Sequence, residues 1–222
     1  MNEILIYSDI GQDWYGEGIT DNWIKQQLDS MKGESQINVR INSVGGDVFQ
    51  GFAIHNLLKE HDAEIVVKVD GLAASSASII AMAGDKIHMA DNAMMMIHNP
   101  WSMAMGESKD MIKTAELLDK IKDSIVTTYH NKTQIDSDQL SDMMDSETWL
   151  TTPEAINQGF ADEKEGQALE VMDMTKPWIK NAPKIIKIQP IENKPEEKPE
   201  IIEPLVTPSK IAAKSRLLEI NL

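Results

Sequence analysis

The stretch VDGLAASSAS, residues 69–78, decides how the centre of the chain is interpreted. An apolar segment begins at residue 63 and runs into this stretch, and a second apolar run, residues 79–83, follows it. The small residues between the two predict a strand that ends shortly before a helix begins. A serine in the first turn of a helix lies beside free backbone N–H groups and the positive end of the helix dipole, where a developing oxyanion is stabilised. The structural alternative is a tightly packed helix whose small side chains permit close contact.

Two further segments favour a catalytic interpretation. INSVGGDV, residues 41–48, places a glycine pair between a predicted strand and a predicted helix. Such a pair either forms a tight turn with positive φ or directs a backbone amide at a substrate oxygen. MMMIHNPW, residues 94–101, places His98 after an apolar strand that Asn-Pro ends. A lone histidine is often structural, but histidine is also the usual base for a serine nucleophile.

Composition limits the possible classes of function. The 222 residues carry a formal net charge of −15, which argues against nucleic acid or an anionic membrane as the main partner. There is no cysteine, which excludes disulfides and thiolate chemistry and fits a reducing compartment. The N-terminus lacks the pattern of a signal peptide, and no apolar run approaches the roughly 18 residues of a membrane span. We therefore expect a cytoplasmic protein with no metal and no cofactor.

Strand and helix patterns alternate along the first part of the chain. This alternation predicts a largely parallel sheet and an α/β fold. We expect strands at residues 3–10, 36–43, 63–71 and 85–99, and helices at residues 19–31, 47–61, 73–84, 107–133, 136–147 and 151–162.

The chain changes character after residue 176. Residues 177–222 are rich in Pro, Lys and Glu and bury too little apolar surface to fold alone, so we expect a disordered linker. Its end, residues 208–222, has a serine start signal and apolar residues at helical spacing, which predict one short helix. The expected organisation is a folded domain over residues 1–176 followed by this tail.

Four segments together resemble the ClpP family of serine peptidases. GLAASSAS resembles the family's GxAAS(M/S) nucleophile segment, and MMIHNP resembles its MIHxP histidine segment. INSVGG resembles the INSPGG oxyanion loop, and ETWLTTPEAINQGFAD resembles the (D/E)xFLSxxEAxxYGLxD segment. The resemblance covers residues 37–162 in the family's order. It implies a spiral of ββα units with a protruding handle helix, here residues 107–133, and assembly into rings.

The resemblance assigns roles residue by residue. Ser75 matches the nucleophile and His98 the general base, while the amides of Gly46 and Ser76 match the oxyanion hole. The family's acid lies two residues before an aromatic residue, which is Trp149 here, so Glu147 matches it. Glutamate replaces the aspartate of the housekeeping peptidase, and the neighbouring Asp145 remains an alternative for the third triad position. Ser78 has no catalytic counterpart and is interpreted as a packing or capping residue.

The branch of the family follows from the two ends of the chain. Housekeeping ClpP has an N-terminal segment that forms axial loops where an ATPase docks, whereas the first strand expected here begins at residue 3. Together with the added tail, this feature resembles the ClpP-related head maturation (prohead) proteases of tailed phages and prophages. That resemblance implies an ATP-independent homo-oligomer that cleaves scaffold or major capsid protein in the procapsid interior, within the host cell cytoplasm.

Other classes of function remain open. An ATPase-partnered housekeeping peptidase would share all four motifs. A crotonase-type acyl-CoA enzyme would share the fold and an amide oxyanion hole but would not need Ser, His and an acid in this order. A catalytically idle structural component of the procapsid would tolerate loss of the triad residues, all of which are present.

Overall fold

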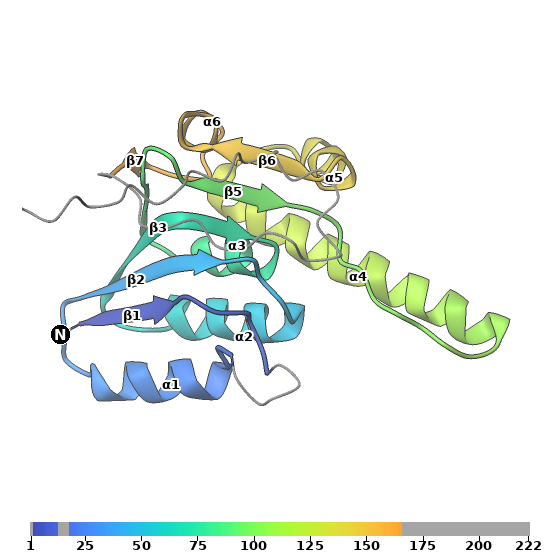
Figure 1. Cartoon of the computed structure of the whole chain (residues 1–222), viewed down its shortest axis with the longest axis horizontal. Coiled ribbons are helices and arrows are strands. Elements are labelled where there is room, and N and C mark those ends of the chain that lie inside the picture. The colour runs from blue at the N-terminus through green and yellow to red at the C-terminus, as the bar shows by residue number, and fades with distance from the viewer. Residues whose placement is uncertain (1, 13–17, 166–222) are drawn as a thin grey trace, which may run out of the picture. The chain divides into compact units, whose positions relative to one another are not determined.

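The computed structural model describes residues 2–12 and 18–165 (Figure 1). The strands are β1 (Glu3–Ile6), β2 (Gln36–Ser43), β3 (Glu64–Ala74), β4 (Lys86–Met89), β5 (Met94–Ile97), β6 (Thr148–Thr151) and β7 (Glu163–Lys164). The helices are α1 (Asp21–Ser30), α2 (Val48–Lys59), α3 (Ser76–Ala81), α4 (Ser108–Thr133), α5 (Ser137–Asp145) and α6 (Thr152–Asn157). The predicted tail and its helix at 208–222 lie outside the described residues. No helix among the described residues combines the length and apolar character needed to cross a bilayer.

The sheet is predominantly parallel. Strands β1, β2, β3, β4 and β7 are neighbours in that order, and every pair along this path is parallel. Strand β5 pairs in parallel with β3, and β6 adds an antiparallel strand beside β5. The expected α/β fold is therefore confirmed, although the short strands β6 and β7 were not predicted.

Strand β3 is long enough to hold two partners in succession. Its first half pairs with β4 through Val66–Val69, and its end pairs with β5 through Leu72–Ala74. The prediction of one strand over 85–99 is thus wrong, because the chain turns at Asp91 and Asn92. Aspartate and asparagine favour turns, since their side chains bond to nearby backbone. This turn moves the chain from one half of β3 to the other.

The predicted helix at 73–84 begins too early. Ala73 pairs with Ser43 and Met95, and Ala74 pairs with Met96, so both alanines belong to β3. Pairing on both sides of the strand outweighs the intrinsic helix preference of alanine. As a result, Ser75 is the single residue between the strand and α3.

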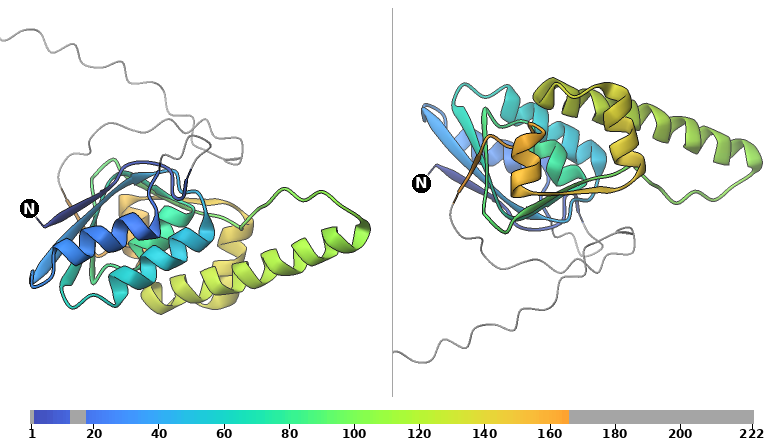
Figure 2. Two further views of the ribbon diagram at one scale, coloured as in Figure 1. Left: turned by 90° about the horizontal axis from the view of Figure 1, so that it is seen from below. Right: turned by 90° about the horizontal axis from the view of Figure 1, so that it is seen from above.

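Helices α1, α2 and α3 lie on one face of the sheet (Figure 2). Helix α1 begins where the Thr20 side chain accepts a hydrogen bond from the Trp23 amide, as the Thr-Asp start signal predicts. Helix α2 begins where Asp47 accepts from the amides of Phe49 and Gln50. The fully buried Ile54 and Leu58 of α2 pack in the core beneath the sheet. The loop that carries Gly45 and Gly46, called the glycine loop below, is therefore held between the end of β2 and the start of α2.

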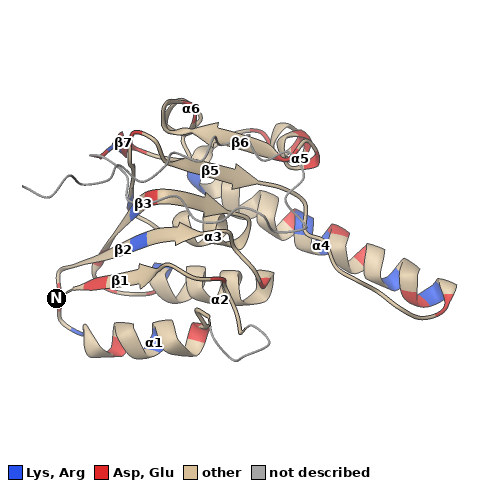
Figure 3. Cartoon of the chain, in the orientation of Figure 1, with Lys and Arg blue, Asp and Glu red and all other residues tan. Residues whose placement is uncertain are grey.

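Helix α4 has two unlike halves. Ile121, Ile125 and Tyr129 are buried in the core, whereas Ile112 and Leu117 are exposed at 56% and 50%. The first half projects away from the sheet and carries basic and acidic residues around its apolar ones (Figures 1 and 3). The predicted protruding helix is present, and its second half packs one side against the core.

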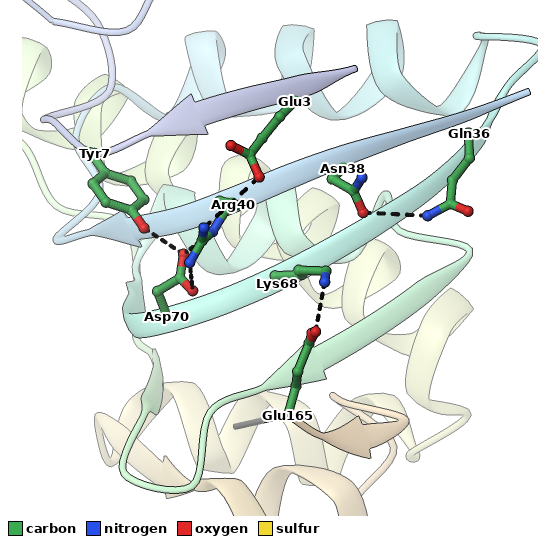
Figure 4. A network of polar contacts seen from close by, with 8 residues as sticks. All are labelled: Glu3, Tyr7, Gln36, Asn38, Arg40, Lys68, Asp70 and Glu165. Carbon is green, nitrogen blue, oxygen red and sulfur yellow. Dashed lines mark hydrogen bonds and ion pairs between the residues drawn. The ribbon is translucent and has the colours of Figure 1, made fainter. Parts of the chain in front are cut away.

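The opposite face of the sheet carries a polar network (Figure 4). The Asp70 carboxylate accepts hydrogen bonds from Arg40 Nε at 2.9 Å, Arg40 Nη2 at 2.6 Å and the Tyr7 hydroxyl at 2.5 Å. Burial and this bond to Asp70 raise the pKa of Tyr7 to about 12, so the phenol remains a donor at neutral pH. Strands β1, β2 and β3 are thereby joined through side chains as well as backbone.

Asp70→Asn is expected to destabilise the fold. The variant leaves Arg40 without its bidentate carboxylate in a partly buried site, which should lower the free energy of unfolding by roughly 2–3 kcal/mol. Urea unfolding measures the loss. The matched control is Glu64→Gln, which removes a carboxylate that pairs with the exposed Lys86 at 2.9 Å. This variant should change the free energy of unfolding by less than about 0.5 kcal/mol. Equal losses in the two variants would contradict the structural role of the network.

Candidate active site

Three of the sequence motifs meet at the carboxyl ends of neighbouring parallel strands. Ser75 follows β3, His98 follows β5, and Gly45 and Gly46 follow β2. The pairing of Ala74 with Met96 and of Ala73 with Ser43 sets these strand ends side by side. In open α/β sheets this edge is where ligands bind.

Ser75 has a backbone conformation that few side chains adopt, with φ 55° and ψ −128°. Its amide still donates to the Met96 carbonyl at 3.0 Å, while the next residue already belongs to α3. The chain therefore reverses direction within one residue, and the serine stands at the apex of this turn. Strain of this kind, which costs of order 1–3 kcal/mol, is typical of functional sites.

Small residues around Ser75 make this turn possible. A Cβ added at Gly45 would lie 2.7 Å from the Ser75 Cβ and 2.6 Å from the Ala74 carbonyl oxygen. A Cβ added at Gly51, on α2, would lie 2.9 Å from the Ser76 Cβ. Backbone from β2 and from α2 thus approaches the turn too closely for any other residue. The small residues of VDGLAASSAS therefore serve close packing and a strained serine at once.

The Ser75 hydroxyl contacts the predicted base. Ser75 Oγ and His98 Nε2 lie 2.9 Å apart, which is hydrogen-bond distance for a nucleophile and its general base. His98 is reached from β5, whose last residues pair with the end of β3. The contact forms because two parallel strands end together.

Glu147 and His98 flank the same end of the β5–β6 strand pair. Strands β5 and β6 pair Met96 with Trp149 and Ile97 with Thr148, so the last residue of β5, just before His98, is paired with the first residue of β6, just after Glu147. Glu147 is 8% exposed and has a φ of 49°, and its Oε1 accepts a hydrogen bond from Trp149 Nε1 at 3.3 Å. A buried carboxylate thus belongs to the residue just before β6, at the end of the strand pair that His98 follows.

Asp145 is engaged elsewhere. Its Oδ1 accepts hydrogen bonds from Lys122 Nζ at 2.5 Å and from Asn99 Nδ2 at 2.7 Å. The hydrogen bonds from Lys122 and Asn99 hold the pKa of this carboxyl below its usual value. Its side chain is half exposed, in contrast to the buried Glu147. These contacts favour Glu147 over Asp145 as the acid of a triad.

The backbone amides of Gly46 and Ser76, which the sequence proposes for an oxyanion hole, are available to donate hydrogen bonds to a substrate oxygen. Ile10 bonds to the Gly45 carbonyl and to the Asp47 amide, so the Gly46 amide points away from Ile10. The Ser76 amide is in the first turn of α3, where no intrahelical acceptor exists. Neither amide donates a hydrogen bond to another group in the part of the chain that the structure describes.

Ser78 has a contact that the sequence interpretation did not assign. Its hydroxyl lies 2.6 Å from the Ser75 carbonyl oxygen and 2.8 Å from the Tyr129 hydroxyl. A serine three residues into a helix often bonds back to an earlier carbonyl, which is the signal in the sequence that pointed to the first contact. Nothing in the sequence indicated Tyr129.

Known proteins match this chain in sequence and in structure. The model of the family described as Clp protease matches residues 3–165. The ATP-dependent Clp protease proteolytic subunit of Deinococcus radiodurans is 32% identical over 64% of this chain and 71% of that protein. The corresponding subunit of Bacteroides thetaiotaomicron is 30% identical over 65% of this chain and 68% of that protein. A solved structure of a ClpP1 mutant from Listeria monocytogenes superposes with a TM-score of 0.65 at 25% identity, covering 75% of this chain and 92% of that one.

Ser75→Ala is expected to abolish peptide cleavage without unfolding the protein. Losing the nucleophile of a Ser-His-acid site typically costs ~10⁴–10⁶ in rate. The measurement is hydrolysis of a fluorogenic peptide, with circular dichroism as the folding control. Ser76→Ala retains its backbone amide and should stay active. Loss of activity in Ser76→Ala with retention in Ser75→Ala would show that the neighbouring serine attacks.

Glu147→Gln is expected to reduce kcat strongly, whereas Asp145→Asn should reduce it only mildly. A carboxylate that holds the base in its working tautomer can be worth ~10⁴ in rate. Both substitutions remove one negative charge at nearly constant volume, so each is the control for the other. The opposite ranking of kcat would make Asp145 the third member of the site.

Proposed function

Because the chain belongs to the Clp protease family, we propose that it is a serine endopeptidase that forms an acyl-enzyme on Ser75. The single observation that carries this proposal is the 2.9 Å contact between Ser75 Oγ and His98 Nε2 at a strained turn between strand and helix. Ser75 is only partly buried, so a substrate carbonyl can approach it. A catalytically idle structural component would have no need of this arrangement.

The reaction follows from the positions of the groups. Ser75 Oγ attacks the scissile carbonyl carbon while His98 Nε2 takes the hydroxyl proton. The oxyanion accepts hydrogen bonds from the amides of Gly46 and Ser76. The C–N bond then breaks, and His98 returns the proton to the leaving amine. Water, activated by the same imidazole, hydrolyses the acyl-enzyme, while Glu147 orients the imidazole and stabilises its charged form.

We further propose that the active form is a homo-oligomeric ring, as in the family, and that the first half of α4 joins two rings. The exposed side chains of Met111, Ile112 and Leu117 support this proposal, because large apolar residues left exposed on a projecting helix are typical of a contact surface. The occupant is a second copy of the same helix. Mixed charge on this half of α4 suits a self-complementary antiparallel contact (Figure 3).

For the biological role, we propose ATP-independent cleavage of scaffold or major capsid protein during phage head maturation. The Pro-, Lys- and Glu-rich tail after residue 176 supports this branch, and its basic end, residues 208–222, suits docking on an acidic protein. The second candidate is a peptidase partnered with an ATPase, which the names of the two bacterial relatives favour.

The two candidates differ in what they need to cut a protein. Both should hydrolyse short peptides without nucleotide. Only the first should cleave purified scaffold or capsid protein with no ATPase present. Cleavage that appears only when a Clp ATPase and ATP are added would support the second candidate and contradict the first.

Leu117→Glu is expected to separate double rings into single rings. The substitution places a charge on an exposed apolar position of α4, which a dry helix contact cannot accommodate without large cost. Sedimentation velocity measures the change in mass. Lys113→Glu, also exposed on this half of the helix, is the control for added negative charge and should affect assembly less. A wild-type protein that is monomeric at micromolar concentration would contradict the oligomer.

Ending the chain at Lys176 is expected to leave peptide cleavage intact while abolishing scaffold cleavage in assembling procapsids. Residues 1–176 contain every proposed site residue, whereas the removed segment is proposed to recruit the enzyme. Co-purification with procapsids measures recruitment, with full-length Ser75→Ala as the inactive but recruited control. Equal packaging of the shortened and full-length chains would refute recruitment by the tail.

A further inference from the structure

Ser78 and Tyr129 form a buried pair directly behind the nucleophile. Ser78 is fully buried and Tyr129 is 1% exposed. The Ser78 hydroxyl lies 2.6 Å from the Ser75 carbonyl oxygen and 2.8 Å from the Tyr129 hydroxyl. Neither residue has a part in the proposed reaction. The pair therefore needs an explanation of its own.

The direction of both hydrogen bonds follows from counting protons. The Ser75 carbonyl can only accept, so the one hydroxyl proton of Ser78 is donated to it. The bond between the two hydroxyls must then use the proton of Tyr129, with Ser78 Oγ as acceptor. Burial raises the pKa of Tyr129, so its proton is retained. The chain of donors runs from Tyr129 through Ser78 to the Ser75 carbonyl.

That carbonyl belongs to the same peptide group as the Ser76 amide. In a planar trans peptide the C=O and the N–H point in opposite directions, so fixing one fixes the other. The Ser78 amide also donates to the Ser75 carbonyl, at 2.9 Å, and the hydroxyl is a second donor to the same oxygen. The Ile79 amide is a third donor to the Ser75 oxygen, at 3.4 Å. All three donors lie in α3, so they direct the Ser76 amide away from this helix, toward the side on which an oxyanion would form.

The tyrosine is itself rigidly held. It lies in the packed half of α4, and its ring meets Phe160 edge to face with centroids 5.6 Å apart and planes at 62°. The hydroxyl therefore reaches Ser78 from an element that does not belong to the strand ends of the site. A strained turn needs such outside support, since its own backbone favours relaxation.

We propose that Tyr129 and Ser78 are positioning residues that hold the Ser75–Ser76 peptide group so that its amide faces the oxyanion. This inference rests on the proposed serine peptidase function. It assigns a kinetic role to two side chains that never touch the substrate. Their loss should weaken stabilisation of the transition state and leave substrate binding unchanged.

The test is a double-mutant cycle on the full-length protein with Tyr129→Phe, Ser78→Ala and both together. Removing an oxyanion donor costs ~10²–10³ in kcat, and a misdirected donor should cost about 10-fold. We expect each single variant to lose about 10-fold in kcat with KM within about 2-fold. The double variant should lose no more than Ser78→Ala alone, because Tyr129 acts through Ser78.

Phe160→Leu is the matched control. It loosens the packing of the Tyr129 ring but leaves both hydroxyls in place, so it should lower the melting temperature and retain kcat per titrated active site. A wild-type kcat in Tyr129→Phe would overturn the proposal. The proposal would also be overturned if Phe160→Leu lost as much kcat as Tyr129→Phe when the two variants are equally destabilised.

A crystal structure of the double variant separates this inference from the proposed function. The positioning role predicts a rotated Ser75–Ser76 peptide group, and an unchanged group would overturn it. Failure of the wild-type protein to react with a fluorophosphonate would instead overturn the peptidase function. The orientation of the peptide group would still decide whether the pair positions it.

Discussion

The sharp turn at Ser75 is the constraint on which the rest of the structure depends. A serine with φ 55° must leave β3 and enter α3 within one residue, which is possible only where neighbouring backbone comes very close. Gly45 and Gly51 supply that space, each at a position where a Cβ would overlap the turn. The same turn brings the hydroxyl to His98 and leaves the first amide of α3 without an intrahelical acceptor. The strained backbone of Ser75, the close packing of the glycines and the contact with His98 therefore all follow from this one turn.

The surrounding elements each fix one part of this geometry. His98 follows the end of β5, and Glu147 directly precedes β6, whose first residue pairs with the last residue of β5. The packed half of α4 reaches the turn from behind through Tyr129. Helix α4 therefore belongs both to the site and, through its projecting half, to the surface proposed for assembly. The residue proposed to position the turn and the surface proposed for assembly thus lie on neighbouring parts of a single helix.

Much of this arrangement could be predicted from the sequence, because it is encoded locally. Short motifs indicated Ser75, His98 and the glycine loop, and alternating patterns indicated the parallel sheet. Contacts between distant segments could not be predicted, and these account for the errors. The strand expected at 85–99 is broken because the chain pairs first with the beginning of β3, as β4, and then with its end, as β5. Ala73 and Ala74 are strand residues because of the neighbours with which they pair. The bond from Tyr129 to Ser78 spans 51 positions and leaves no pattern in the sequence.

The central claim is that the turn presents Ser75 as a nucleophile with the amides of Gly46 and Ser76 at its oxyanion. The most direct measurement is a crystal structure of the protein treated with a peptide aldehyde. We expect a bond from Ser75 Oγ to the aldehyde carbon, with the resulting oxygen within about 3 Å of both amides. An adduct on any other residue, or an oxygen directed away from both amides, would contradict it.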